Sequence, residues 1–553
     1  MNRCVLRRAV VLLPAVILTA AVLVLFEDPV ASQDVGGTGF RLEEATIADI
    51  HAALDAGTLS CRQLVQLHLN RIRTYEDAGP RLNSITTVNP GAIDVAGALD
   101  DERKAGGREG PLHCIPVLLK DNIDTVDMPT SNGSVILKTA RPPDDAYIVK
   151  ALREAGAVIL GKAAMGEFAA GSYNTIDGQT RNPYDFMRDT GGSSSGPAAA
   201  VAANFTVLAI GTDTSTSVRG PASLNGIVGL RPTTGLISRD GIAPKNLTFD
   251  TAGPMARTVT DATILLNVIA GADPNDRLSL DVHTHYERTD FTEFLRQGSL
   301  KGARLGVARD FFGGDPEIDR LAEAALGTMR ELGAELVDVR FDPDFLEFYV
   351  RGGGANIRRP ADYRFRRDWE AYLETLGPNV PKTVEEFIEI YESTVASSPL
   401  PVAEGVLGLL QRAATSSTDD PVYRNLIESV LPTATKIKLA MFDSNRIDAL
   451  VFPYRASFAS PIRSADSEPR PAQSDRPPDP ATLAGYGSVG FPGIVVPMGF
   501  GSEGLPMTIS FMGRPYTEGT LIGFAYDYEQ ATRLRRPPPL LPPLAGAVTT
   551  TSN

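Results

Sequence analysis

The 553-residue sequence is poor in the residues that bind metals and form disulfide scaffolds. It contains three cysteines, Cys4, Cys61 and Cys114, and five histidines. Three cysteines exclude a disulfide-stapled scaffold and a four-cysteine zinc module. Five histidines are also few for a metalloenzyme of this length. Cys61 and Cys114 could pair in an oxidising compartment, and the sequence alone leaves that question open.

The sequence also lacks an excess of positive charge. It has 53 Lys and Arg residues against 67 Asp and Glu residues, which gives a formal net charge of −14. Nucleic-acid binding requires a basic face, so we expect no nucleic-acid partner. The hydrophobic share of 43% and the charged share of 22% exclude a mostly disordered or fibrous chain.

Long apolar runs are lacking except at the N-terminus. Three arginines precede an unbroken apolar run over residues 9–26, which is typical of a secretory signal. Val30 and Ser32 occupy the −3 and −1 positions of a possible cleavage site. We therefore expect residues 1–32 to be a signal peptide or an uncleaved anchor, and the protein to be periplasmic or extracellular. A membrane contact is expected only through this segment if it is uncleaved.

The remaining sequence alternates predicted helices and short apolar strands, as in an α/β protein. After a flexible lead at 33–40, we expect one large domain over 41–535 whose sheet is closed by the C-terminal strands. We expect a mostly helical insert at 343–445, an exposed proline-rich loop at 460–480 and a loose tail at 536–553. Residues 171–196 should be irregular. Strands are predicted at 115–119, 157–160, 207–210, 301–309, 334–339, 448–452, 493–496 and 507–512.

Two serine-rich tracts, residues 189–200 and 211–221, attract attention because apolar segments flank both closely. A flexible linker would not be embedded in this way. The first tract matches G-x-S-x-G around Ser194, a motif that marks a nucleophile elbow only when a strand precedes it. Residues 182–189 do not read as a strand. The sequence therefore disfavours an elbow.

A Ser-His-Asp hydrolase would also need a histidine downstream of the serine tracts. Only His283 and His285 are available there. Together with Asp281 they could be taken for metal ligands, but the group lacks a third well-spaced donor and reads as a polar loop.

Lysine can replace histidine as the base that activates serine when burial keeps it neutral. Lys120 is the best candidate, because it ends the apolar run 115–119 and precedes Asp121 and Asn122. On this evidence alone, an ordinary lysine at the end of a strand is an equally good interpretation.

Several longer motifs carry a resemblance to a known family. The chain closely resembles the amidase signature family, whose members are Ser-Ser-Lys amide hydrolases, over roughly residues 40–535. Three of these motifs contain candidate catalytic residues: GPLHCIPVLLKDNID contains Lys120, DTGGSSSGPAAAVAA contains Ser193 and GTDTSTSVRGPAS contains Ser217. Ser217 follows Ser193 by 24 residues. The matching segments include GPLHCIPVLLKDNID at 110–124, DTGGSSSGPAAAVAA at 189–203, GTDTSTSVRGPAS at 211–223, GIVGLRPTTGLISRDGI at 226–242 and DTAGPMARTVTDA at 250–262.

The resemblance implies a large mixed central sheet covered by helices on both faces. It also assigns roles, with Ser217 as the nucleophile, Ser193 as the bridge at a cis peptide and Lys120 as the base. The oxyanion hole would be formed by the backbone N–H groups of Thr214, Ser215, Thr216 and Ser217.

Two positions depart from the family pattern. The family usually has glycine just before the nucleophile, where this chain has Ser215 and Thr216. If the backbone there requires positive φ, these two residues are strained. Cys114 stands where the family commonly has glycine, which puts the local backbone geometry in question.

The expected function is that of an exported amidase, a monomer or homodimer. It would cleave a small carboxylic or peptide-terminal amide to the acid plus ammonia or an amine. No cofactor and no metal are implied. One alternative is an amidotransferase subunit that releases ammonia for a partner, which an export signal disfavours. Another is an inactive binding protein on the same fold, which the intact Lys120, Ser193 and Ser217 disfavour.

Overall fold

The computed structural model describes most of the chain beyond its N-terminal segment. The predicted signal segment 1–32 lies outside the described residues, and so do residues 463–480 of the predicted loop. Contacts group residues 39–553 into one compact unit. Among the described residues, no helix has the length and apolar character that crossing a bilayer requires. The described ranges are 40–106, 110–286, 290–346, 360–395, 405–462, 490–544 and 548–549.

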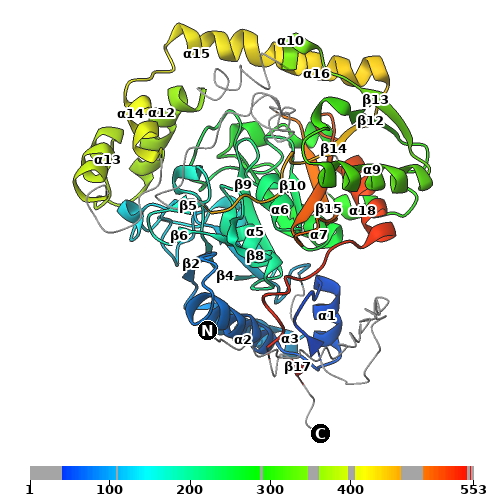
Figure 1. Ribbon diagram of the computed structural model, residues 1–553. Helices are drawn as coiled ribbons and strands as arrows, with labels where there is room; N and C mark the ends of the chain where they lie inside the picture. The colour runs from blue at the N-terminus through cyan, green and yellow to red at the C-terminus, as the bar shows by residue number, and fades with distance from the viewer. Residues whose placement is uncertain are drawn as a thin grey trace, which may run out of the picture. The chain divides into compact units, whose positions relative to one another are not determined.

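A mixed sheet forms the centre of this unit (Figure 1). Parallel pairs join β12 to β13 and β14, and β3 to β4 and β9, while the other neighbours are antiparallel. The predicted α/β class with a large mixed sheet is therefore confirmed. Within the described chain its eleven strands lie in the order β13 (Glu335–Val339), β12 (Arg304–Ala308), β14 (Ala449–Pro453), β16 (Pro506–Met512), β15 (Gly493–Phe500), β10 (Val228–Arg231), β11 (Thr251–Ala256), β9 (Leu208–Asp213), β3 (Pro116–Lys120), β4 (Val158–Ala163) and β2 (Ile85–Val88).

The C-terminal strands lie inside the sheet rather than at its edge. β15 and β16 are placed between β14 and β10, so they join the β12–β14 part of the sheet to the part that contains β3 and β9. These strands are almost entirely buried. The last strands of the chain therefore complete the core that supports the central strands.

Helices begin where the sequence offers capping residues. Thr46 and Ser60 form capping boxes at the starts of α1 and α2, and α1 buries Ile47, Ile50 and Leu54. The helices are α1 (Ile47–Asp55), α2 (Cys61–Ile72), α3 (Ala92–Lys104), α4 (Tyr147–Glu154), α5 (Ser195–Ala202), α6 (Arg219–Leu224), α7 (Val259–Ile269), α8 (Val282–His285), α9 (Pro316–Glu331), α10 (Pro343–Phe345), α12 (Pro360–Thr375), α13 (Val384–Ile390), α14 (Val406–Ala414), α15 (Pro421–Asn425), α16 (Leu431–Asn445) and α18 (Glu518–Thr532).

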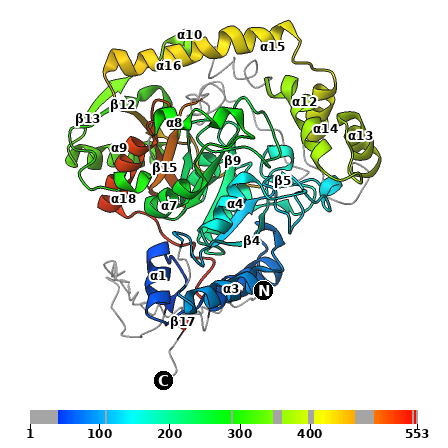
Figure 2. The same ribbon diagram turned by 180° about the vertical axis from the view of Figure 1, so that it is seen from behind.

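Two groups of helices cover the central strands. α5 and α6 contact each other, and together they pack on β3, β9, β10 and β15. On the other side, α4, α7, α18 and α9 contact one another in succession. α5 faces the viewer in Figure 1, and α4 faces the viewer in Figure 2. The short helices α5 and α6 begin inside the two serine tracts, so their mutual contact brings the tracts close to each other.

The helices α12, α13 and α14 have an aromatic core of their own. Trp369 is fully buried and packs on Phe365 and Phe387. Phe168, from the turn after β4, enters this cluster with its ring centroid 5.4 Å from that of Trp369. Tyr372 Oη also donates to Asp124 Oδ1 at 2.8 Å. The first contact attaches the helical region to the turn after β4, and the second attaches it to the loop that follows β3.

The prediction that residues 182–189 form no strand is wrong. β7 (Arg181–Asn182) and β8 (Asp185–Asp189) form a small antiparallel pair, and β5 (Tyr173–Asn174) pairs with β6 (Gly178–Gln179) inside the segment predicted to be irregular. β8 is half-exposed and is held by backbone hydrogen bonds. One set pairs it with β7, and another bond runs from Asp189 N–H to Ser460 O at 2.8 Å. No apolar face is buried there, so hydrophobic alternation gives no signal.

Candidate functional site

Lys120 is the last residue of β3, a strand that is buried over its whole length. Its side chain is fully buried. Nζ donates to Ser193 Oγ at 2.7 Å, to Thr212 Oγ1 at 2.8 Å and to Thr212 O at 3.2 Å. The strand therefore delivers an amine to the first serine tract, and the neighbouring strand β9 fixes its position.

Burial lowers the pKa of Lys120 from about 10.5 to about 7, against the opposing effect of the Asp213 and Asp250 charges. A salt-bridged lysine would stay protonated, but no carboxylate lies within hydrogen-bond distance of Nζ among the described residues. A large fraction of the amine is therefore neutral near pH 7. Such a lysine has the protonation state that a general base needs.

The first serine tract turns sharply between β8 and α5. The peptide bond between Gly192 and Ser193 is cis. Ser194 N–H donates to Ser217 O at 3.2 Å, and Ser194 Oγ donates to Thr212 O at 3.2 Å. These bonds bring Ser193, which contacts the lysine, beside Ser217 of the second tract.

Ser217 lies in the turn between β9 and α6, and it is 8% exposed. Asp213 holds this turn, because its Oδ2 accepts the Val218 N–H at 3.1 Å and lies 3.4 Å from Arg219 Nε. Arg231 Nη1 lies 2.9 Å from the other oxygen. Burial alone would raise the pKa of Asp213, but the two guanidinium groups hold it below its ordinary value. The carboxylate is therefore charged and fixes the turn.

The backbone at Ser215 and Thr216, just before Ser217, does not have the positive φ that would strain these residues. Ser215 and Thr216 are absent from the residues with positive φ, so serine and threonine fit where the family usually has glycine. Among the described residues, the N–H groups of 214–217 donate no hydrogen bond within the loops of the protein. Thr214 Oγ1 donates to Asp250 Oδ1 at 2.6 Å, which anchors the start of this turn.

The histidines considered as alternatives do not join this site. His285 stacks on Tyr516 with the ring centroids 3.5 Å apart, and His283 lines a separate cavity. Within the described part of the chain, no hydrogen bond links a histidine to Lys120 or Ser193. Although β8 precedes it, Ser194 has no histidine partner there and its hydroxyl is fully buried.

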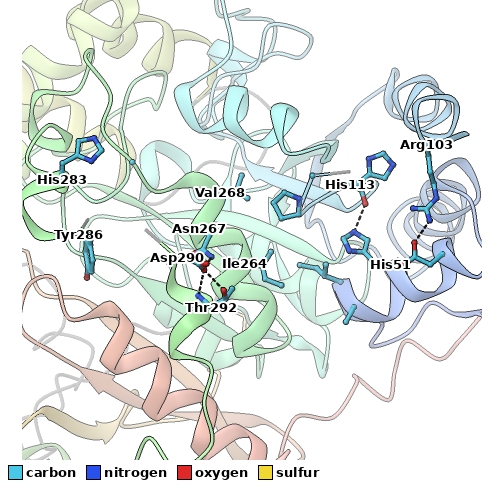
Figure 3. Close-up of a pocket in the computed structure, with 16 residues that line it drawn as sticks. His51, Arg103, His113, Ile264, Asn267, Val268, His283, Tyr286, Asp290 and Thr292 are labelled. Carbon is cyan, nitrogen blue, oxygen red and sulfur yellow. Dashed lines mark hydrogen bonds and ion pairs between the residues drawn. The ribbon is translucent and has the colours of Figure 1, made fainter. Parts of the chain in front are cut away.

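A cavity of about 970 Å³ lies away from the serine tracts between α1, α3 and α7. Figure 3 shows some of its side chains bonded to neighbouring groups. His51 Nε2 lies 3.1 Å from His113 O, Arg103 pairs with Asp55, and Asn267 Nδ2 donates to an aspartate at 2.9 Å. These groups are held in structural contacts, and the residues that line the cavity include none of Lys120, Ser193 and Ser217.

A disulfide joins Cys61 to Cys114, with Cα atoms 5.1 Å apart. Cys114 has a φ of 66°, which explains why glycine suits this position in the family. Cys61, His113 and Cys114 form the single cluster of potential metal ligands within the described residues. The disulfide uses both sulfur atoms, so the cluster has no thiolate to offer a metal.

Replacing both Cys61 and Cys114 with serine should lower the free energy of unfolding. The bond closes a loop of 53 residues, for which about 2–4 kcal/mol is expected. Denaturant unfolding of the wild type and the double variant, each with and without reductant, measures the effect. Reductant should destabilise only the wild type. Two free thiols in the denatured, unreduced wild type would contradict the bond.

Sequence reasoning missed several residues of this site. Thr212 and Asp213 lie inside the second tract, and their positions just before the predicted nucleophile were a usable signal. Arg231 and Asp250 lie further along the chain, and only strand pairing brings them to the turn. No pattern in the sequence indicates those contacts.

Comparisons with known proteins give matches over most of the chain. A family model described as Amidase matches residues 63–522. A glutamyl-tRNA(Gln) amidotransferase subunit from Chloroflexus aurantiacus is 36% identical over 510 residues, covering 89% of this chain and 97% of that protein. A probable amidase of Arabidopsis thaliana is 33% identical, covering 92% and 94%. The crystal structure of the native peptide amidase of Stenotrophomonas maltophilia superposes with a TM-score of 0.79 at 37% identity, covering 90% and 99%.

Proposed function

The chain belongs to the amidase family, and from this premise we propose that it hydrolyses amides through an acyl-enzyme formed on Ser217. The reaction class, hydrolysis of a carbon–nitrogen bond, follows from the family. The proposal adds the catalytic residues, with Lys120 as base and Ser193 as proton bridge. Backbone N–H groups of residues 214–217 form the oxyanion hole.

The proposed steps balance in protons and bonds. Ser217 Oγ attacks the amide carbonyl carbon while its proton passes to Ser193 Oγ, and the Ser193 proton passes to neutral Lys120 Nζ. The fixed N–H donors stabilise the oxyanion. The carbon–nitrogen bond then breaks, and the ammonium of Lys120 returns a proton through Ser193 to the leaving amine. Water attacks the ester by the same route and releases the acid.

One observation carries this proposal. A fully buried lysine with a pKa of about 7 donates to Ser193 Oγ at 2.7 Å, and a backbone bond fixes the Ser217 tract beside it. An inactive binding protein would have no need of a neutral buried amine, which costs folding free energy. We propose a small carboxylic amide or a peptide-terminal amide as substrate, handled by a monomer or homodimer.

Turnover by the purified chain alone tests the proposal. Simple carboxylic amides and peptide amides are incubated with the protein, and the released ammonia or amine is measured. Turnover supports the amidase. No turnover of any amide, together with no labelling by a fluorophosphonate, would favour an inactive binding protein.

A second candidate is an amidotransferase subunit, favoured by the 36% identity to such a protein. That relative is named for an activity on glutamyl-tRNA(Gln). If this chain shared the role, it would release ammonia well only with a partner. Robust hydrolysis of simple amides by the chain alone contradicts this alternative.

We also propose that the protein is exported. The support is the arginine-rich start, the single apolar run at 9–26 and a disulfide of the kind found in oxidising compartments. The mature protein is expected to begin near Gln33. N-terminal sequencing of protein from the producing cell measures this, and a retained Met1 with membrane association would favour the anchor.

A further inference from the structure

Among the described residues, three oxygen atoms lie within hydrogen-bond distance of Lys120 Nζ, and two of them belong to Thr212. They are Thr212 Oγ1 at 2.8 Å, Thr212 O at 3.2 Å and Ser193 Oγ at 2.7 Å. The Lys120 side chain is fully buried, so its amine depends on these contacts for its hydrogen bonds. A lysine nitrogen has three positions besides its bond to Cε, and here each of them has an oxygen partner.

A count of protons shows what this arrangement means for the neutral amine. The ammonium form of lysine has three N–H groups, whereas the neutral form has two N–H groups and one lone pair. The amine can take the proton of Ser193 only if its lone pair points at Ser193 Oγ. Both N–H groups must then be donated to Thr212, because Thr212 supplies the other two oxygens.

The carbonyl oxygen of Thr212 is a fixed acceptor. Ser194 Oγ accepts the Thr212 N–H at 3.2 Å and donates to Thr212 O at 3.2 Å, so the neighbour of Ser193 holds the Thr212 backbone. A carbonyl has no proton to donate. The position of Lys120 Nζ that faces this oxygen is therefore an N–H group in both protonation states.

The hydroxyl oxygen of Thr212 is held by a different residue. Asn122 Nδ2 donates to Thr212 Oγ1 at 3.2 Å and to Ala243 O at 3.3 Å. Since a carbonyl only accepts, the contact with Ala243 requires the amide nitrogen of Asn122 at this place. Thr212 is 6% exposed, and its β-branched side chain has few rotamers. Its Oγ1 therefore has a fixed place beside the lysine.

Resting on the proposed function, we propose that Thr212 is a positioning residue that accepts both N–H groups of neutral Lys120 and so directs the lone pair of Nζ at Ser193 Oγ. As the Ser193 O–H bond breaks and the new N–H bond forms, Ser193 receives the proton of Ser217. The resulting ammonium has an acceptor for each of its three N–H groups, two on Thr212 and one on Ser193. Lys120 can therefore take up and return a proton without moving.

The first test is kinetic. Thr212→Val removes the hydroxyl and keeps the shape of the side chain, so the lone pair is no longer held on Ser193. The kcat on a simple amide should fall roughly tenfold to hundredfold with KM nearly unchanged. Thr212→Ser restores the oxygen and should keep most of the activity. Should Thr212→Val fail to fold, Thr212→Ala lacks the same hydroxyl and has the same expected effects.

Thr206→Val is the matched control. Thr206 is also fully buried, and its hydroxyl donates to Pro116 O at 2.9 Å. It lies two residues before β9 begins, whereas Thr212 lies one residue before β9 ends. The control therefore loses a buried, hydrogen-bonded hydroxyl at the other end of the same strand, and its kcat should stay at the wild-type value.

The pH profile distinguishes positioning from a general loss of structure. Burial lowers the pKa of Lys120 to about 7, while the charges of Asp213 and Asp250 raise it. A hydrogen bond from a charged donor is stronger than one from a neutral donor, so Thr212 Oγ1 favours the ammonium form. In Thr212→Val the acid limb of kcat/KM should therefore move down by roughly half to one pH unit while the plateau falls.

A measurement without turnover separates this inference from the proposed function. Lysine labelled with carbon-13 at Cε is incorporated into the protein, and the Lys120 resonance is identified by its loss in Lys120→Met. In an NMR titration its midpoint should be lower in Thr212→Val than in the wild type, and unchanged in Thr206→Val. That shift supports the role of Thr212 even if another residue proves to be the nucleophile.

Four results would overturn the proposal. The first is a wild-type kcat and an unshifted Lys120 midpoint in Thr212→Val. The second is a lower kcat with an unmoved acid limb, which would give Thr212 a structural role only. The third is a higher kcat in Thr212→Val, which would mean that the hydroxyl donates to the lone pair and competes with Ser193. The fourth is an equal loss of kcat in Thr206→Val.

Discussion

Replacing Ser217 with alanine should abolish amide hydrolysis, with a fall in kcat on the order of 10⁶-fold, as for loss of the nucleophile in other serine hydrolases. The side chain lies in a turn held by Asp213 through backbone and arginine contacts, not through the Ser217 hydroxyl. The variant should therefore fold as the wild type does. Residual turnover is measured with a simple amide, and thermal unfolding checks the fold.

Covalent labelling locates the nucleophile independently. A fluorophosphonate should label the wild type at Ser217 and should not label Ser217→Ala. The exposed Ser502 offers a matched control, because Ser502→Ala removes a hydroxyl far from the serine tracts in sequence. Labelling at Ser194 in the wild type would contradict the assignment and restore the nucleophile-elbow interpretation.

Replacing Lys120 with methionine should reduce kcat/KM by at least the roughly 10²–10⁴-fold expected from loss of a general base. Methionine keeps the length of the side chain and fits the apolar surroundings of β3, but it cannot accept the proton from Ser193. Steady-state rates on one amide measure the effect, with Lys436→Met as the control that removes an exposed charge.

The pH dependence gives a second test of the same base. The pKa of Lys120 is about 7, so the protonated, inactive form dominates below that pH. The wild-type kcat/KM should fall about tenfold per pH unit on the acid side and level off above neutrality. If Lys120→Met stays active while His283→Ala is inactive, the Ser-Ser-Lys mechanism is wrong.

The central sheet was predictable where strands bury continuous apolar runs, and unpredictable elsewhere. Strands such as β3 and β9 have that pattern. β11 contains Gly253 and Pro254, which normally argue against an interior strand. A Cβ on Gly253 would lie 2.2 Å from Leu230 O, so the close approach of β10 requires glycine there. Glycine normally weakens a strand, but at position 253 the packing of Leu230, which is distant in sequence, requires it.

The residues of the candidate site also fall into two groups, those that the sequence indicated and those that it did not. The order of motifs in the sequence led to Lys120, Ser193 and Ser217, because each lies in a recognisable local segment. The supporting charges did not follow, because Arg231 and Asp250 reach the Ser217 turn only through the pairing of β10, β11 and β9. The contact of Tyr372 with Asp124 likewise depends on how α12 folds back over the loop after β3.

If Lys120 is the base that we propose, its burial sets activity against conformational stability. In the unfolded chain this lysine would be protonated up to about pH 10.5, whereas in the folded chain it loses its proton at about pH 7. The unfolded state therefore binds more protons between these values, and the contribution of Lys120 to stability grows more favourable as the pH rises through that window. At neutral pH the buried amine therefore weakens the fold, a cost that enzymes accept where function requires it. The Cys61–Cys114 disulfide adds stability next to the strand that carries this lysine, because Cys114 lies two residues before the first residue of β3.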